Sequence, residues 1–223
     1  MSVHGNKARI YTGTAYFLLD KTRSSLRIQI VHYDQSGLGM PSISPGWFQF
    51  LTKGVRLIIT EPKVEYRPEQ HYAAIRAQVP IPFGSLIPPL NREVTAWLAD
   101  RGMKPSGASI IRYFTTDMSQ KLDIEVGWLV AEAVPGDERV ISGVIPAGRY
   151  AVLMYTGSYW GKGIYKATVA LLDWAEKNHI TWKKTIIDDV EWWDSRNEYY
   201  LTDPNEEPDP KKWKTELAFL VAD

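Results

Sequence analysis

The chain has 223 residues, 44% of them hydrophobic and 23% charged, which is enough apolar material for one large domain or for one domain with an appendage. Its 26 basic and 26 acidic residues cancel, so we expect no direct DNA binding, and the absence of cysteine excludes disulfides, thiolate metal sites and a cysteine nucleophile. No stretch predicts a signal peptide or a membrane span, and we expect a cytoplasmic protein without membrane contact.

Residues 1–57 differ in charge from the rest of the chain, with seven basic and two acidic residues. Two apolar stretches, 14–20 and 26–33, predict strands, and residues 37–46 predict a loop. We expect an N-terminal extension of unknown role that is rich in β-structure, followed by a second domain over residues 58–223.

The second domain begins with a predicted strand over residues 71–80. The next segment, 85–102, has apolar residues at helical spacing and prolines only in its first turn, which predicts a helix that ends at Gly102. Residues 109–117 and 122–131 predict two more strands.

The same order of elements recurs in the second half of the domain. The sequence predicts a strand over 149–159, a helix over 162–178, and strands over 197–204 and 214–223. The half-repeats therefore cover residues 61–131 and 139–223.

The spacing between equivalent residues supports this duplication. Tyr72 and Tyr150 are 78 residues apart, and Trp97 and Trp174 are 77 apart. We expect an α+β fold in which two strand-helix-strand-strand units pair around a pseudo-twofold axis. They would form one curved antiparallel sheet with two helices on one face and a central pocket.

Each half ends in an apolar strand that contains a glutamate, with a small residue two places further on. The pairs are Glu125 with Gly127 and Glu216 with Ala218, and residues i and i+2 of a strand share a face. A buried carboxylate is costly unless it is compensated, so this pattern predicts the floor of a pocket for a positive charge. The alternative is an exposed face that happens to carry glutamate. The apolar residues in between would pack under the helices.

The second half carries an acidic insertion after its helix. Residues 188–209 contain nine acids and one base, Arg196, and four aromatic residues lie among them: Trp192, Trp193, Tyr199 and Tyr200. Aromatic faces and carboxylates both attract cations, which predicts a wall or lid for a flat cationic ligand. A solvated acidic loop is the alternative, favoured for residues 203–210. We expect Glu216, in the half with the insertion, to be drier than Glu125.

Several segments together resemble the GyrI-like small-molecule-binding family, the effector-binding domain of AraC- and MerR-type multidrug regulators. They are ITEPKVEYRPEQHYAAIR, LDIEVGWLVA, IPAGRYAVLMYTGSY, LLDWAEKN and YLTDPNEEPDPKKWKTELAF. The resemblance covers residues 58–223. It implies the duplicated fold and a central pocket for bulky aromatic, often cationic compounds, in which a buried glutamate contacts the positive charge.

The resemblance transfers a ligand role to Glu216, by the repeat to Glu125, and to Glu198 as a third candidate. The aromatic candidates for ligand contacts are Tyr113, Tyr155, Trp193 and Tyr199. Regulators of this type carry a helix-turn-helix domain before the binding domain, and residues 1–57 do not predict one.

Three functions stay open at this point. The first is a standalone protein that sequesters or senses cationic aromatic compounds. The second is a hydrolase that opens strained cyclopropane rings of DNA-alkylating natural products, with Glu125 and Glu216 in catalytic roles. The resemblance suggests it because some standalone members of the family are similar to such hydrolases. The third is a gyrase-inhibitor-like contact with DNA gyrase. Four scattered histidines and an incomplete phosphate-loop motif predict no cofactor and no metal site.

Overall fold

The computed structural model describes residues 16–20, 27–31, 57–116 and 121–222. The chain divides into two compact units, residues 1–53 and 54–223. In the first unit, β1 (Tyr16–Asp20) pairs antiparallel with β2 (Arg27–Val31), which confirms the two predicted strands. The loop predicted over 37–46 lies outside the described residues, and the assignment of 1–57 to a separate extension stays a prediction.

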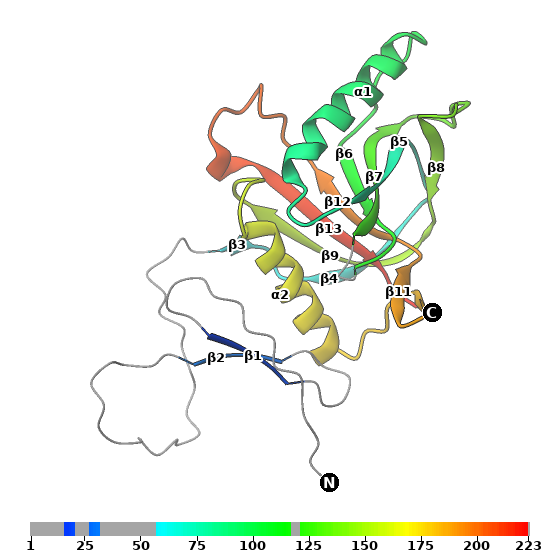
Figure 1. The fold of residues 1–223 in the computed structure, drawn as a ribbon. Coiled ribbons are helices and arrows are strands. Elements are labelled where there is room, and N and C mark those ends of the chain that lie inside the picture. The colour runs from blue at the N-terminus through cyan, green and yellow to red at the C-terminus, as the bar shows by residue number, and fades with distance from the viewer. Residues whose placement is uncertain (1–15, 21–26, 32–56, 117–120, 223) are drawn as a thin grey trace, which may run out of the picture. The chain divides into compact units, whose positions relative to one another are not determined.

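The second unit is built on one antiparallel sheet of nine strands, which curls into a half-barrel (Figure 1). The strands are β3 (Ile58–Ile59), β4 (Lys63–Arg67), β5 (Gln70–Val79), β6 (Ser109–Tyr113), β7 (Leu122–Val130), β8 (Ile141–Ile145), β9 (Gly148–Thr156), β12 (Arg196–Tyr200) and β13 (Lys214–Leu220). Their order is β3-β9-β13-β12-β6-β7-β5-β8, and β4 also pairs with β9. The central strands of the sheet are therefore β6 and β12.

Two helices cover one face of this sheet (Figure 1). The helix α1 (Ile87–Ala99) follows a short 3-10 turn, η1 (Gly84–Leu86), and has its prolines at the start, where a missing backbone N–H is tolerated. It packs on β5 and β7, whereas α2 (Gly163–Lys177) packs on β9 and β13. The two helices thus cover equivalent strands of the two halves.

The strand register confirms the predicted duplication. The halves run β5-α1-β6-β7 and β9-α2-β12-β13. Glu125 lies opposite Arg76 of β5, and Glu216 lies opposite Met154 of β9. The shift from Arg76 to Met154 is 78 residues, the same as the shift between the equivalent tyrosines of β5 and β9. The expected α+β fold with a pseudo-twofold arrangement is therefore present.

The extra residues of the second half begin with a hairpin. Its strands are β10 (Lys184–Ile187) and β11 (Val190–Trp193), and they form a separate two-stranded sheet. Asp188 and Asp189 connect them with φ angles of 51° and 64°, as a tight two-residue hairpin turn requires. A short 3-10 turn, η2 (Pro210–Lys212), precedes β13.

The sheet has a helix face, which carries α1 and α2, and an inner face on the inside of the curl. As predicted, the large apolar residues beside the two glutamates of the repeat pack under the helices: Trp128 and Val130 against α1, and Leu217 and Phe219 against α2. The inner face has its own core of Tyr72, Ala74, Ile110, Ile145, Tyr150, Val152, Tyr199, Ala218 and Leu220.

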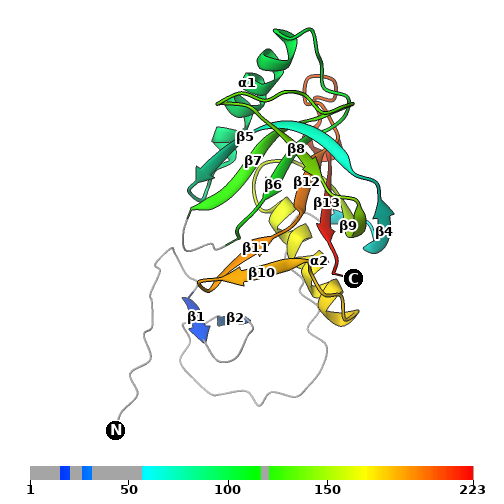
Figure 2. The ribbon, with the colours of Figure 1, turned by 90° about the vertical axis from the view of Figure 1, so that its right-hand side faces the viewer.

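The segment from β4 to β5 closes the half-barrel. β4 pairs with β9 near one end of the sheet, whereas β5, which follows after two residues, pairs with β7 and β8 at the other end (Figure 2). We call residues 63–70 the strap. Its side chains Arg67 and Gln70 contact β13 and β12 on the inner face.

The small residue in the first glutamate strand does not open a pocket floor, contrary to expectation. A Cβ on Gly127 would lie 2.0 Å from the backbone oxygen of Ala73 and 2.6 Å from Cα of Ala74. The volume that the missing side chain leaves is therefore occupied by the backbone of β5, which approaches β7 closely at this point.

Candidate ligand-binding site

The seven candidate site residues lie on two different faces of the sheet. Glu125, Glu216 and Tyr199 lie on the inner face; Glu198, Tyr113 and Tyr155 lie on the helix face, and Trp193 of β11 packs into the core beneath α2. The structure therefore does not bring all seven together, and their roles as ligand contacts stay predictions.

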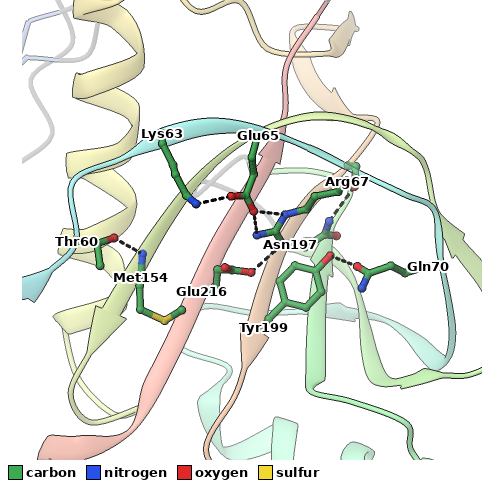
Figure 3. A network of polar contacts seen from close by, with 10 residues as sticks. Thr60, Lys63, Glu65, Arg67, Gln70, Met154, Asn197, Tyr199 and Glu216 are labelled. Carbon is green, nitrogen blue, oxygen red and sulfur yellow. Dashed lines mark hydrogen bonds and ion pairs between the residues drawn. The ribbon is translucent and has the colours of Figure 1, made fainter.

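Glu216 belongs to a polar network that crosses the inner face (Figure 3). Arg67 Nη1 donates to Glu216 Oε1 at 2.7 Å, and Arg67 Nη2 donates to Glu65 Oε1 at 2.7 Å. The Arg67 guanidinium also lies 5.8 Å from the centre of the Tyr199 ring, whose hydroxyl donates to Gln70 Oε1 at 3.1 Å. Because Arg67 and Gln70 belong to the strap, this network fixes the strap to β12 and β13.

The Glu216 carboxylate is already paired with a cation. Burial by itself would lower the pKa of Arg67, but the hydrogen bond and the charge of Glu216 outweigh this effect and raise that pKa. Glu65 is bonded to both Lys63 and Arg67, which lowers the pKa of Glu65. A ligand cation at this place would have to compete with Arg67 for Glu216.

Glu125 is held in a hydrogen-bond chain on the same face. The Tyr72 hydroxyl donates to Glu125 Oε2 at 2.5 Å, and Arg112 Nη1 donates to the Tyr72 hydroxyl at 2.6 Å. Burial raises the pKa of Glu125, against the hydrogen bond from Tyr72 and the charge of Arg112. The Glu125 carboxylate is thus compensated by groups of the protein itself.

The expectation that Glu216 is the drier glutamate is wrong. Glu125 is buried, whereas Glu216 is only half-buried. The physical reason is the position of Tyr72, whose hydroxyl reaches Glu125. Its ring lies over Gly143 on the neighbouring strand, where a Cβ would be only 2.1 Å from the ring. The first half can therefore bury its carboxylate beneath an aromatic side chain.

The helix face carries a third carboxylate at its centre, Glu198 of β12. It lies opposite Ile111 of β6 and Leu217 of β13, between the strands that the two helices cover. Glu198 is buried, and the Tyr200 hydroxyl donates to its Oε2 at 2.7 Å. Tyr113 lies on the same face and is close enough to this carboxylate to affect its pKa.

The protonation of this cluster follows from its burial. Burial raises the pKa of Glu198, although the hydrogen bond from Tyr200, the nearby Tyr113 hydroxyl and the charge of Arg196 act in the opposite direction. The pKa values of both tyrosines lie well above the usual value, chiefly because their hydroxyl groups are removed from water. Both phenols therefore remain protonated and can serve as donors to the carboxylate.

Further aromatic rings pack against the two tyrosines of this cluster. The Tyr159 ring meets the Tyr200 ring edge-on, with 4.9 Å between ring centres, and is tilted against Trp213 at 4.7 Å. Phe83 meets Tyr113 edge-on at 6.3 Å. Phe83 and Tyr159 come from equivalent connections, β5 to α1 and β9 to α2, so both halves contribute rings to the centre of the helix face.

A planar cation of the chain already lies on this face. The guanidinium of Arg196 is 4.8 Å from the centre of the Trp193 ring and 4.7 Å from the centre of the Phe219 ring. Burial lowers the pKa of Arg196, against the favourable charge of Glu198. The helix face near Glu198 is thus able to hold a flat cation between aromatic rings.

The edge of this cluster is marked by an exposed tryptophan. Trp160, in the connection from β9 to α2, is 56% exposed. A Cβ on Gly84 would lie 3.5 Å from Cζ3 of Trp160, so the indole packs against the connection from β5 to α1. Trp160 therefore joins the two equivalent connections next to Phe83.

The aromatic residues of the insertion do not form a single wall. Trp193 and Tyr199 are buried in different cores, and Trp192 and Tyr200 are half-buried. The prediction that these side chains are not left free in water is confirmed. Of the four, Tyr200 is the residue whose hydroxyl donates to Glu198. Residues 203–206 are exposed, as a solvated acidic loop predicts.

The candidate ligand contacts did not include four residues of the Glu198 cluster: Phe83, Tyr159, Tyr200 and Trp213. Tyr200 was, however, among the aromatic residues of the predicted wall. The alternation of a strand offered a signal for one of them. In the stretch NEYY, Glu198 and Tyr200 are two residues apart and share a face, whereas Tyr199 takes the other. The three remaining residues lie outside the central strands and reach the cluster only through the fold.

Within the described ranges, no group of three or more histidine, aspartate or glutamate side chains could hold a metal ion. Among the helices of this part of the chain, none is long and apolar enough to cross a membrane.

Comparison with known proteins places this fold in a family. Residues 60–222 match the GyrI-like small molecule binding domain. The chain belongs to the GyrI-like family. A search of curated protein sequences finds no match.

Solved structures share the fold of this GyrI-like domain at low identity. The C-terminal domain of EcmrR is 20% identical with a TM-score of 0.54, over 75% of this chain and 99% of that one. EcmrR in its complex with DNA is 22% identical with a TM-score of 0.54, over 72% of this chain and 57% of that one, so the present chain spans little more than half of that relative. An uncharacterized conserved protein from Listeria innocua is 12% identical with a TM-score of 0.50, over 73% and 92% of the two chains.

Proposed function

We propose that this GyrI-like domain binds bulky aromatic cations on its helix face, with Glu198 as the counter-charge. The observation that carries the proposal is a buried carboxylate at the junction of the two half-repeats, which accepts a hydrogen bond from Tyr200 and lies next to a cluster of aromatic rings. Sequestration or sensing of such compounds would both use this site.

The chemistry of the cluster favours a cation over a neutral or anionic ligand. An aromatic cation supplies the charge that a buried carboxylate lacks and presents a flat surface to the rings. A neutral ligand gains only the ring contacts, and an anion is repelled by the carboxylate. The carboxylates of the inner face suit this role less well, because Glu216 is paired with Arg67 and Glu125 is linked through Tyr72 to Arg112.

A titration with one dye and its uncharged parent tests the proposal. We expect 5-ethyl-6-phenylphenanthridinium to quench tryptophan fluorescence with micromolar affinity, or about −8 kcal/mol, and neutral 6-phenylphenanthridine to bind much more weakly. Glu198→Gln should weaken binding of the cation by about 1.5–3 kcal/mol, the usual scale for a charged hydrogen bond. Glu206→Gln, a matched change of an exposed glutamate in the acidic loop, should leave binding unchanged.

Three outcomes would contradict the proposal. Equal affinity for the cation and its neutral parent would show that no carboxylate sets the selectivity. Equal losses in the Glu198 and Glu206 variants would point to general acidity of the loop. Loss of binding in Glu216→Gln with full binding in Glu198→Gln would move the site to the inner face.

Hydrolysis of strained rings is the second candidate, and the raised pKa of Glu198 is the observation that favours it. A carboxyl group that stays protonated nearer to neutral pH can act as a general acid toward a leaving group. Incubation of the purified protein with a cyclopropane-containing electrophile, followed by product analysis, tests this function. Turnover that is lost in Glu198→Gln supports it, and recovery of unchanged substrate leaves the protein as a binder. Contact with DNA gyrase stays a prediction.

A further inference from the structure

A threonine beside the Glu198 cluster has a hydroxyl without a hydrogen-bond partner among the described residues. Thr215 of β13 is fully buried, and its Oγ1 makes no hydrogen bond there. Native structures leave few buried polar groups unpaired, because such a group loses its bonds to water and gains none in return. The Thr215 hydroxyl can therefore form a hydrogen bond with a molecule other than the protein, such as a ligand.

The position of Thr215 relative to the carboxylate follows from the register. Thr215 lies directly opposite Tyr200, whereas Glu198 lies opposite Leu217. Thr215 and Glu198 are thus diagonal neighbours on the same face. The backbones of two residues in this position are about 7–8 Å apart, within reach of a single ligand. Tyr200 occupies the corner between them.

The neighbouring hydroxyls are already engaged, which explains why Thr215 is left without a bond. Tyr200 donates its hydroxyl to Glu198. Tyr155, the partner of Thr215 on the other side, directs its hydroxyl toward the backbone oxygen of Ser158 at 3.4 Å. Neither tyrosine hydroxyl therefore forms a hydrogen bond with Thr215.

We propose that Thr215 is a second recognition point for the ligand and selects aromatic cations that carry a hydrogen-bonding substituent in addition to the positive charge. This inference rests on the proposed function, because it uses the same site and the same charge. It narrows the ligand class from aromatic cations in general to aminated or hydroxylated ones.

Two dyes that differ only in the substituent test this inference. Ethidium is the 5-ethyl-6-phenylphenanthridinium ion with two amino groups added to the ring system. Thr215→Val keeps the shape of the side chain and removes the hydroxyl, and Thr215→Ser keeps the hydroxyl. We expect Thr215→Val to weaken ethidium binding about three- to tenfold, the range of one neutral hydrogen bond, and to change binding of the unsubstituted ion less than twofold. Thr215→Ser should retain the preference for ethidium.

The unliganded protein offers an independent readout. Removal of an unpaired buried hydroxyl should leave the melting temperature of Thr215→Val unchanged or raise it, whereas loss of a bond to a fixed internal water would lower it. A lowered melting temperature, or equal changes in affinity for both dyes, would overturn the inference while the proposed function stands. If the wild-type protein binds neither dye, or if Glu198→Gln leaves binding of the unsubstituted ion intact, the proposed function itself fails.

Discussion

Glu198 and Tyr199 are consecutive residues of β12, yet their side chains lie on opposite faces of the sheet. Glu198 accepts a hydrogen bond from Tyr200 on the helix face, and Tyr199 donates to Gln70 of the strap on the inner face. A strand at the centre of a two-sided core thus serves two polar clusters at once. Substitutions at these neighbouring positions should have separable effects, which makes the following predictions testable one face at a time.

Binding of a cationic dye should strengthen as the pH rises through the pKa of Glu198. That pKa lies above the usual value of 4.5, so the free protein keeps part of its carboxyl groups neutral in weakly acidic solution. A cation favours the charged form, and its binding therefore releases a proton. Isothermal titration calorimetry between pH 5 and pH 8, in buffers of different ionisation enthalpy, measures both effects. An affinity that does not change with pH would contradict this assignment.

Glu198→Gln should be more stable than the wild type at alkaline pH. The folded-state pKa of Glu198 is raised, so its contribution to stability is fully present below the unfolded value of 4.5 and is lost as the pH rises through the folded value. The amide carries no charge to desolvate, so we expect the variant to be more stable than the wild type at pH 8 and to lose this advantage at pH 4. Urea unfolding at pH 8 and pH 4 checks this, and a gain that is larger at pH 4 would refute the sign.

Tyr72→Phe should destabilise the fold by about 1–3 kcal/mol, because it leaves the buried carboxylate of Glu125 without its hydroxyl donor. The loss should be larger at pH 8, where the carboxylate is charged, than at pH 5. Tyr66→Phe serves as the control, since that side chain is largely exposed. Equal unfolding free energies for the two variants would show that the bond to Glu125 contributes nothing.

Gly127→Ala should destabilise the protein by more than about 4 kcal/mol, the range in which a substitution forces the backbone to move. Its methyl group would overlap the Ala73 oxygen and the Ala74 backbone. Gly102→Ala meets open space and should cost only about 1–2 kcal/mol for its left-handed backbone conformation. Chemical denaturation of both variants compares steric overlap with conformational strain. Similar losses would mean that β5 can move away from β7.

A fragment of residues 54–223 should fold without the first unit, since these residues form a compact unit of their own. Its near-ultraviolet circular dichroism should retain the tryptophan signals of Trp182, Trp193 and Trp213, which pack against other aromatic rings. A molten spectrum, with weak near-ultraviolet bands at normal far-ultraviolet intensity, would contradict the domain boundary.

Local patterns were sufficient to predict most of this fold. Helical spacing and proline position located α1, and the shared shift of about 78 residues predicted the pseudo-twofold arrangement that the register of Arg76 and Met154 confirms. The candidate site was harder to predict, because the face to which a glutamate points depends on the curl of the sheet and on residues far away in the chain. Arg67, which pairs with Glu216, is separated from it by 149 residues.

The two equivalent glutamates also show that a sequence repeat does not predict equivalent roles for its residues. Glu125 and Glu216 are equivalent in register, but one is covered by Tyr72 and the other is paired with an arginine of the strap. Their sequence context predicted a common role, whereas their hydrogen-bond partners differ: Tyr72 of β5 donates to Glu125, and Arg67 of the strap donates to Glu216. The residue at the centre of the helix face, Glu198, has Ile111 as its cross-strand partner in the other half.

The contacts of the strap determine the order in which parts of this protein can fold during synthesis. The partners of β5 are β7 in the first half-repeat and β8 at the start of the second, whereas the partner of β4 is β9 and the carboxylate that binds Arg67 is on β13. A nascent chain can therefore assemble the first half while β4 still has a free edge, and the ion pair can form only after the final strand has left the ribosome. We expect chains that stall before β13 to expose an unpaired strand next to an unfilled apolar interior, which makes them substrates for chaperones or proteases.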